Sequence, residues 1–222
     1  MPDPFGTAAV RDRVLAAWAA SPARFREDAN AEQDLTHGAY RDRLLVELAQ
    51  NAADAAARSG VDGRLRLSLV DGQLLAANNG APLDAAGVQA LATLRASAKR
   101  DGGSVGRFGV GFAAVLTVTD EPSVRSTTGG VRFSAADTRT AVAAVPALAG
   151  ELDRRDGQVP VLRLPWAADP LPAGEWDTEV RLPLRPDAVD AVRAALASLD
   201  PVLLLALPAL RSIDAGGRVL SR

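Results

Sequence analysis

The sequence predicts a single domain that combines α-helices with a β-sheet. With 222 residues, of which 48% are hydrophobic, the chain is long enough to bury one sizeable core. Apolar residues such as Val10, Val14 and Trp18 recur at helical spacing in the N-terminal part. From residue 123 onward, short apolar or alternating segments separated by Gly and Pro indicate strands instead. These three observations favour the α/β class.

Two long helices are predicted in the first sixty residues. The first covers residues 8–20, and the Ser21-Pro22 pair ends it because proline disfavours helical geometry in the preceding residue. A polar stretch over residues 26–36 follows. Residues 40–59 are the longest predicted helix, since they are rich in Ala and Leu, contain no Gly or Pro, and meet a stop signal at Gly60.

A β-hairpin is predicted next. Residues 64–69 alternate with period two, Asp71-Gly72 is a strong tight-turn dipeptide, and residues 73–77 continue as a second strand. Asp84 is placed to cap a short helix that extends through Leu94. A loop of Gly and small residues over 95–105 then leads to a helix around 109–116.

The second half of the chain is predicted to supply the remaining strands and a last helix. The predicted strands are residues 123–126, 131–134, 140–145, 159–164 and 178–184. Pro186-Asp187 opens a helix that extends to residue 199, and Pro201 interrupts it. An apolar run over 202–210 precedes the Gly216-Gly217 turn.

Composition and charge argue against several function classes. The net charge of −2 and the pI near 5.5 give no basic surface for nucleic acid, and no Lys/Arg-rich run marks a membrane surface. Without cysteine and with one histidine, His37, the chain is not expected to form disulfides or a transition-metal site. The N-terminus lacks signal-peptide features and no apolar run approaches the ~20 residues that span a bilayer, so we expect a cytoplasmic protein.

A stripe of polar residues follows one side of the helix predicted over residues 40–59. Glu47, Asn51, Asp54 and Arg58 recur at i, i+4, i+7 and i+11 and therefore share a face. One interpretation is a solvated surface with an Asp54–Arg58 pair worth only ~0.2–0.5 kcal/mol. The other is a nucleotide-handling surface, in which an amide oxygen binds Mg²⁺ and a carboxylate one turn away deprotonates a water. Mg²⁺ suits such a surface because it prefers oxygen ligands and usually keeps several waters.

Three glycines are spaced as Gly-x-x-Gly-x-Gly in Gly106-Arg107-Phe108-Gly109-Val110-Gly111-Phe112, just before an apolar predicted helix. Free N–H groups at a helix N-terminus bind phosphate without a basic side chain, although a plain glycine-rich turn also fits this pattern. A Rossmann motif does not fit because a loop precedes the glycines, and a Walker loop does not fit because no Gly-Lys-Ser/Thr ending is present.

Lys99 is the only lysine of the chain and lies in the loop before these glycines. Basic residues elsewhere are all Arg, so this lysine can be a chance survival. Alternatively, it supplies a compact mobile charge near the phosphates.

The segment Glu47-Leu48-Ala49-Gln50-Asn51-Ala52-Ala53-Asp54-Ala55 resembles the Glu-x-x-x-Asn-x-x-Asp-Ala box of the GHKL ATPase superfamily. This superfamily joins DNA gyrase, the ninety-kilodalton heat-shock chaperones, histidine kinases and MutL. The Asp54-Ala55 pair favours the chaperone and MutL branches, since histidine-kinase boxes usually lack it. The resemblance implies that Glu47 is the general base, that Asn51 is the magnesium ligand and that Asp54 belongs to the ATP site.

The glycine segment closely resembles the chaperone family's own glycine box. The resemblance implies that residues 95–105 form a mobile lid and that the nucleotide contacts include Lys99, Gly106, Phe108, Gly109, Val110, Gly111 and Phe112. The implied fold is the Bergerat-type ATP-binding fold, an α/β (α+β) two-layer sandwich. In this fold, helices cover one face of a mixed, mostly antiparallel sheet.

The base pocket is where the chain departs from the family. The family's Asp-x-Gly motif accepts a hydrogen bond from the adenine amino group, and this chain has Asn78-Asn79-Gly80 in its place. An amide oxygen can still accept, but a hydrogen bond to a neutral group is weaker, so affinity drops by about tenfold. Because an amide can rotate to offer a donor to guanine, we expect adenine preference with looser exclusion of guanine. A simple Asn-Asn-Gly turn is the alternative interpretation.

Farther along the chain, Asp177-Thr178 resembles the family's Gly-Thr box at the start of a strand. The resemblance implies that Thr178 lies in the base pocket, although Asp177 replaces the glycine. The Asn-containing base motif and the apolar tail are also similar to those of sacsin-type proteins.

Together, these similarities imply that residues 1–222 are one N-terminal ATP-binding domain of a longer protein. Residues 1–39 hold the leading helix and polar segment, 40–185 the nucleotide-binding core, and 186–222 a C-terminal helix and exit segment. The expected function is weak, Mg²⁺-dependent ATP hydrolysis in a protein of heat-shock chaperone or sacsin type. A non-hydrolysing nucleotide sensor and a histidine-kinase-type protein kinase are the alternatives.

The cofactors implied by the resemblance are ATP or ADP and Mg²⁺. Besides the adenine nucleotide, the expected partners are a client or partner protein and a second copy that makes a transient dimer through the lid. Neither nucleic acid nor a membrane is expected as a partner.

Overall fold

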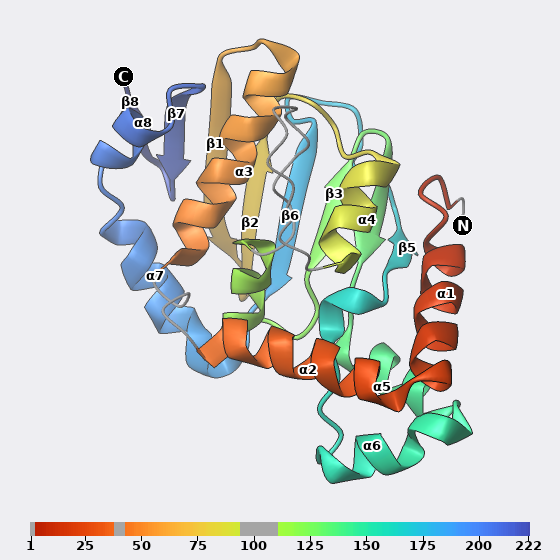
Figure 1. Cartoon of the computed structure of the whole chain (residues 1–222). Helices are drawn as coiled ribbons and strands as arrows, with labels where there is room; N and C mark the ends of the chain where they lie inside the picture. Colours follow the sequence, from red (N-terminus) through yellow and green to blue (C-terminus); the bar gives the residue numbers. More distant parts are fainter. Residues whose placement is uncertain (1–2, 38–42, 94–110) are drawn as a thin grey trace.

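The computed structural model describes residues 3–37, 43–93 and 111–222. Eight strands form one mixed sheet in the order β5-β4-β3-β6-β2-β1-β7-β8 (Figure 1). These strands are β1 (Gly63–Val70), β2 (Gln73–Asn78), β3 (Ser123–Ser126), β4 (Gly129–Arg132), β5 (Trp166–Ala168), β6 (Thr178–Pro183), β7 (Leu210–Ala215) and β8 (Arg218–Ser221). Neighbouring strands are antiparallel except for β1 and β7, which run parallel. The predicted α/β class and mixed, mostly antiparallel sheet are confirmed.

Helices precede, interrupt and follow the strands along the described chain. The α-helices are α1 (Thr7–Ala20), α2 (Pro22–His37), α3 (Leu44–Ser59), α4 (Ala85–Thr93), α5 (Ala135–Ala143), α6 (Ala149–Arg154), α7 (Val189–Ala197) and α8 (Val202–Ala206). Short 3₁₀ segments are η2 (Gly111–Thr117), η3 (Pro146–Leu148), η4 (Val161–Arg163) and η5 (Pro186–Ala188). Figure 1 shows α3 and α4 on the same face of the sheet, with α2 running across its lower end.

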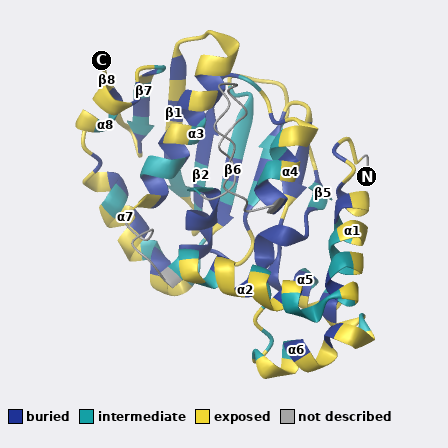
Figure 2. Cartoon of the chain, in the orientation of Figure 1, coloured by how far each residue is buried: buried dark blue, intermediate teal, exposed yellow. Residues whose placement is uncertain are grey.

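The predicted hairpin is formed by β1 and β2. Asp71 and Gly72 both have positive φ, at 49° and 71°, as the favoured two-residue hairpin turn requires. Within β1, Leu65 and Leu67 are buried while Arg64 and Arg66 are exposed, so one face of the strand meets the core. Figure 2 shows the same separation of buried and exposed positions across the molecule.

Helix α3 packs its apolar side against β1. Leu44, Leu48 and Ala52 are among its buried residues and recur every four positions. The helix ends as predicted at Gly60, which adopts a left-handed conformation and donates its N–H back to the last turn. The predicted start at residue 40 lies outside the described residues.

The polar stretch over residues 26–36 belongs to helix α2, which the sequence analysis did not predict. Pro22 is tolerated because the first residue of a helix has no intrahelical acceptor for its N–H. Phe25, Ala29 and Glu32 are all buried at helical spacing, so the periodicity was present but one of its three positions is an acid. Because Glu32 is an acid at a buried position, the amphipathic pattern of α2 was not recognised from the sequence.

Two predicted strands are wrong. Residues 140–145 fall mainly in helix α5, because the hydroxyl of Ser134 accepts the N–H of Asp137 at 3.2 Å and caps that helix. Residues 159–164 contain the 3₁₀ turn η4 in place of a strand. The predicted strands at 123–126, 131–134 and 178–184 correspond to β3, β4 and β6.

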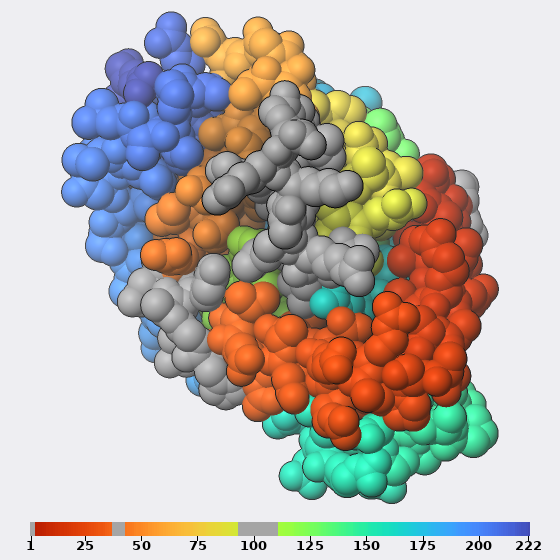
Figure 3. Space-filling view, viewed as in Figure 1, coloured from red at the N-terminus to blue at the C-terminus, as the bar shows by residue number. Residues whose placement is uncertain are grey.

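The C-terminal segment joins the sheet. The predicted helix after Pro186 is formed by η5 and α7, and the following apolar run contains α8. Strand β7 pairs with β1, and β8 forms a sheet edge, so residues 210–221 are part of the same layer and not only an exit segment. On the face drawn in Figure 3, the C-terminal elements lie on the side opposite to α1.

At the other sheet edge, α1 packs beside β5. Arg11 donates to the carbonyl of Pro165 at 2.6 Å and lies over the Trp166 ring. A small apolar cluster around Trp18 and Phe25 joins α1 to α2, separately from the main core. In the described part of the chain, no helix combines the length and apolar character needed to cross a membrane.

Candidate functional site

Helix α3 carries three of the predicted site residues, and these three differ in burial and in whether they line a cavity. Asn51 lines a cavity between α3 and the sheet. Glu47, one turn earlier, is half-buried, and Asp54 is exposed. Asp54 is not among the residues that line the cavity, so the structure does not bring this predicted contact to the site.

Glu47 lies directly against Gly111, the last glycine of the glycine segment. A Cβ atom on residue 111 would overlap the Oε2 atom of Glu47, so this approach requires glycine. Burial raises the pKa of the Glu47 carboxyl above its ordinary value, while the Arg43 guanidinium acts in the opposite direction. The carboxylate makes no hydrogen bond with another described residue. No other described residue therefore occupies the lone pairs of this half-buried carboxylate.

The cavity beside α3 collects predicted residues from four separate segments. Asn51 comes from α3, Asn78 from the end of β2, Phe112 from η2 and Thr178 from the start of β6. The other lining residues are Leu48, Ala55, Arg58, Leu65, Ala76, Ala81, Leu83, Val124 and Val180. This wall is mostly apolar with a few polar groups, which is the usual composition of a small-molecule site.

The cavity is small in this structure, about 30 Å³. Ligand pockets typically measure about 300–1,000 Å³. An aromatic base can therefore enter only if the surrounding side chains move.

Asn78 and Thr178 are neighbours because β2 and β6 pair in antiparallel register, with these two residues opposite each other. Asn78 is 7% exposed, and its Nδ2 donates to the carbonyl of Asn79 at 3.0 Å. The hydroxyls of Thr178 and the fully buried Ser126 lie 3.1 Å apart. The side-chain amide oxygen of Asn78, Oδ1, has no hydrogen-bond donor among the described residues, so it is available as an acceptor.

Gly80 fixes the loop after β2 against α3. Its φ of +127° is unfavourable for other residues, and a Cβ atom there would lie 2.6–2.7 Å from the backbone of Ala55 and Ala56. The next residue, Ala81, donates its N–H to the carbonyl of Ala55 at 2.9 Å. The predicted Asn78-x-Gly80 motif thus joins the end of β2 to the helix that carries Asn51.

Two further residues have contacts in this site that the sequence analysis did not predict, although it noted Asp177 as the replacement of the family's glycine. Asp177 accepts the N–H of Gly80 at 2.9 Å through Oδ2, and its own N–H donates to the carbonyl of Asn78 at 3.0 Å. Ser126 accepts the N–H of Leu83 at 3.0 Å and donates to the carbonyl of Asp177 at 2.8 Å. The available signal for Ser126 was its position two residues after the buried Val124, on the core side of β3.

The structure describes only the last two residues of the glycine segment. Lys99, Gly106, Phe108, Gly109 and Val110 lie outside the described residues. Gly111 and Phe112 are described, and they begin the 3₁₀ helix η2 in the region where a helix was predicted. Phe112 is buried and reaches the cavity, whereas Gly111 contacts Glu47.

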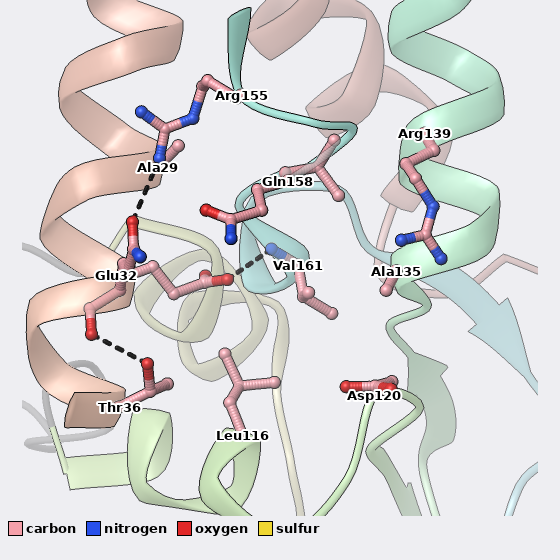
Figure 4. Close-up of a pocket in the computed structure, with 12 residues that line it drawn as sticks. Ala29, Glu32, Thr36, Leu116, Asp120, Ala135, Arg139, Arg155, Gln158 and Val161 are labelled. Atoms are coloured by element: carbon pink, nitrogen blue, oxygen red, sulfur yellow. Dashed lines mark hydrogen bonds between the residues drawn. The ribbon is translucent and has the colours of Figure 1, made fainter. Parts of the chain in front are cut away.

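A second, larger cavity of about 250 Å³ lies between α2, α5 and the segment before η4 (Figure 4). Its most buried acid is Glu32, which accepts backbone N–H groups from Val161 and from Leu162, the latter at 3.0 Å. Burial raises the pKa of Glu32 to about 7 although these two N–H groups act against it. Figure 4 shows Glu32 extending from α2 toward Val161. Because both oxygens bind backbone, Glu32 attaches α2 to η4.

The larger cavity contains none of the predicted site residues. Arg155 lies on its wall and donates to Asn30 at 2.6 Å and to Gln33 at 3.4 Å. Arg139 extends from the facing helix α5 (Figure 4). Of the two acids on its wall, Glu32 is bonded to the backbone through both oxygens, and Asp120 pairs with Arg185 at 3.0 Å. The smaller cavity is the better candidate for a functional site because it gathers the predicted residues Asn51, Asn78 and Thr178.

Comparison with known proteins identifies no family model that matches this sequence and no similar curated protein.

Proposed function

We propose that this chain binds ATP in the cavity between α3, β2 and β6 and hydrolyses it, as a Bergerat-type ATP-binding domain. The observation that supports this proposal most strongly is the position of Asn51, Asn78, Phe112 and Thr178. All four were predicted as nucleotide contacts, they come from four separate segments, and they line one cavity. A solvated stripe or an isolated turn gives no reason for this convergence.

In the proposed complex, the adenine base occupies the apolar part of the cavity. Asn78 Oδ1 accepts a hydrogen bond from the adenine amino group, and the hydroxyl of Thr178 lies beside it on the neighbouring strand. Adenine presents an amino donor there, whereas guanine presents a carbonyl oxygen that repels Oδ1. Adenine is therefore the favoured base.

Asn51 fits the role of a magnesium ligand. Its half-buried amide lines the cavity and makes no hydrogen bond to a described residue, so its oxygen is free to bind a hard cation. Mg²⁺, when bound, neutralises charge on the phosphate oxygens. Gly111 at the start of η2 places backbone close to Glu47, on the side where the phosphates would lie in this proposal.

Glu47 is the proposed general base. It takes a proton from a water whose oxygen attacks the γ-phosphorus, and the bond to the β,γ-bridging oxygen breaks to give ADP and phosphate. Its raised pKa makes it a stronger base than an ordinary glutamate, and no described residue donates a hydrogen bond to it. One turn of α3 separates it from Asn51, which brings base and metal ligand to the same end of the nucleotide.

The wider role follows only from the sequence resemblance. It favours a chaperone-type ATPase of the heat-shock or sacsin kind, acting on a client protein and making a transient dimer through residues 95–105. A phosphotransfer role is less well supported, because the box on α3 includes the Asp54-Ala55 pair.

Calorimetric titration tests the proposed function. ADP and a non-hydrolysable ATP analogue should bind the protein in the presence of Mg²⁺, and Asn51→Ala should lose the Mg²⁺-dependent part of the affinity. Arg155→Gln, which alters the larger cavity, is the matched control and should bind normally. No binding to the wild-type protein at millimolar nucleotide would contradict the proposal. Binding without measurable ATP turnover would favour a non-hydrolysing nucleotide sensor.

A further inference from the structure

The peptide unit between Asn79 and Gly80 is held at both of its polar ends. Its carbonyl, on Asn79, accepts Nδ2 of Asn78 at 3.0 Å, and its N–H, on Gly80, donates to Oδ2 of Asp177 at 2.9 Å. These two contacts belong to one rigid plane, so the orientation of that plane determines both. The carboxylate of Asp177 thereby fixes the acceptor that the Asn78 amide uses.

The Asn78 amide has only one orientation that satisfies this arrangement. A carbonyl acceptor on Asn79 requires the NH₂ group, which leaves Oδ1 for a ligand. Rotating the amide by half a turn would place two oxygens against each other and lose the hydrogen bond. Rotation of the Asn78 amide becomes possible only if the Asn79–Gly80 peptide flips and turns its carbonyl away from that amide.

Glycine at position 80 permits the change in backbone angles that such a flip needs. The flip changes ψ of Asn79 and φ of Gly80, and glycine tolerates both signs of φ. The side chain of Asn79 is independently fixed, since it accepts the N–H of Arg64 at 2.6 Å and donates to the carbonyl of Asp62 at 3.1 Å. Asp177 is the side chain that holds the N–H of this peptide in the observed orientation.

We propose that Asp177 is a positioning residue that selects the nucleobase: by holding the Asn79–Gly80 peptide, it keeps the Asn78 amide oxygen toward the ligand. Adenine, which has an amino group at position 6, is then accepted, and guanine, which has a carbonyl oxygen at that position, is rejected. This inference rests on the proposed nucleotide-binding function. It also revises the expectation from sequence that a freely rotating amide relaxes discrimination. A polarised peptide strengthens the effect, because hydrogen bonds in a chain reinforce one another.

The test is the ratio of the dissociation constants for GDP and ADP, measured by calorimetry on the wild-type protein and on three variants. Wild type should prefer ADP by about tenfold or more, the ratio that one hydrogen bond gained or lost produces. Asp177→Ala should reduce the preference to about threefold or less. Asp177→Asn keeps an acceptor for the Gly80 N–H and should retain most of it. Glu175→Gln removes a carboxylate from the same loop, where it pairs with Arg64, and should leave the ratio unchanged.

A double-mutant cycle separates positioning from general damage to the fold. An aspartate at position 78 cannot donate to the Asn79 carbonyl, so in an Asn78→Asp background the Asp177→Ala change should no longer alter the ratio. In parallel, the Gly80 amide proton should exchange faster with solvent in Asp177→Ala than in the wild type, whether or not nucleotide is present.

The outcomes are distinguishable. An unchanged GDP:ADP ratio in Asp177→Ala, with ADP still bound, overturns this inference and leaves the proposed function standing. Wild-type protein that binds neither nucleotide overturns the proposed function and this inference with it. Unchanged protection of the Gly80 amide in Asp177→Ala overturns the role of Asp177 independently of any ligand.

Discussion

Two glutamates in the N-terminal half of the chain, Glu32 and Glu47, differ in what their carboxylates contact. Both have a pKa that burial raises. Glu32 is almost completely buried and accepts two backbone N–H groups at the start of η4. Glu47 is half-buried, contacts Gly111, and accepts no hydrogen bond from a described residue. One acid is bonded to the backbone, whereas the other receives no hydrogen bond within the described part of the chain.

This difference shows that a raised pKa alone does not identify a catalytic group. Structural carboxylates also show perturbed pKa values when they are buried. What separates the two is the availability of lone pairs and the neighbouring residues, since Asn51 lies one turn from Glu47 at the edge of the smaller cavity. The comparison predicts opposite consequences when each glutamate is changed to glutamine.

The largest effect is expected from Glu47→Gln. Without a base to accept the proton of the attacking water, ATP turnover should fall by about 10²–10⁴-fold. Nucleotide affinity should be retained, and the free energy of unfolding should change by no more than about 0.5 kcal/mol because Glu47 makes no hydrogen bond in the described structure. Steady-state kinetics and urea denaturation of the same preparation measure both quantities. Full turnover in the variant would remove Glu47 from this role.

Glu32→Gln should instead alter stability and its dependence on pH. The folded-state pKa of about 7 lies above the ordinary value of 4.5, so Glu32 favours the folded state below pH 4.5 and progressively less as the pH rises to about 7. At about 1.4 kcal/mol per pH unit, the loss is on the order of 3 kcal/mol. The wild-type unfolding free energy should therefore fall more steeply between pH 5 and pH 8 than that of the variant. Parallel pH dependences in urea denaturation would contradict this assignment.

Gly111→Ala tests the contact between Glu47 and Gly111 from the glycine side. The added methyl group would displace the Glu47 carboxylate while leaving the residue itself present. A displacement of about 1 Å can cost up to ~10²-fold in rate, so turnover should fall by up to that factor with little change in stability. Gly150→Ala is the matched control, since a Cβ atom there has only Arg154 near it, at 3.8 Å. Equal turnover in the two glycine variants would show that the position of Glu47 does not matter.

The smallest effect is expected from Arg43→Ala. Arg43 lowers the pKa of Glu47 against the larger effect of burial, so its removal should raise that pKa further. The base must be ionised to act, and turnover should therefore be lost at a higher pH on the acid side of the kcat profile than in the wild type. The wild-type midpoint should itself lie above the ordinary 4.5. A midpoint that moves downward in the variant would contradict the proposed coupling.

Local signals in the sequence were sufficient for the hairpin and for α3. The Asp71-Gly72 turn and the Ala- and Leu-rich run that ends at Gly60 act through neighbouring residues, and both predictions are confirmed. The parallel pairing of β7 with β1 was not predictable, because it depends on contacts between distant parts of the chain. Helix α2 was missed because burial of Glu32 depends on η4, which lies far along the sequence.

In the candidate site, too, contacts between distant parts of the chain could not be predicted from local sequence signals. The motif resemblance identified Asn51, Asn78 and Thr178, and the structure brings all three to one cavity. It also placed Asp54 in the site, where the structure leaves it exposed. The role of Asp177 depends on its hydrogen bond with Gly80, 97 positions away, and no local sequence pattern predicts such a contact.

The most direct test of the proposed nucleotide site is the response of the side-chain amides to ADP and Mg²⁺, observed by NMR on ¹⁵N-labelled protein. Asn51→Ala and Asn78→Ala assign the two resonances of the small cavity, and Asn30, bonded to Arg155 beside the larger cavity, is the internal reference. We predict that the Asn51 and Asn78 resonances shift on addition of ADP and Mg²⁺ while Asn30 stays in place. Unperturbed Asn51 and Asn78 resonances at millimolar ADP, or a shift of the Asn30 resonance alone, would contradict nucleotide binding in the small cavity.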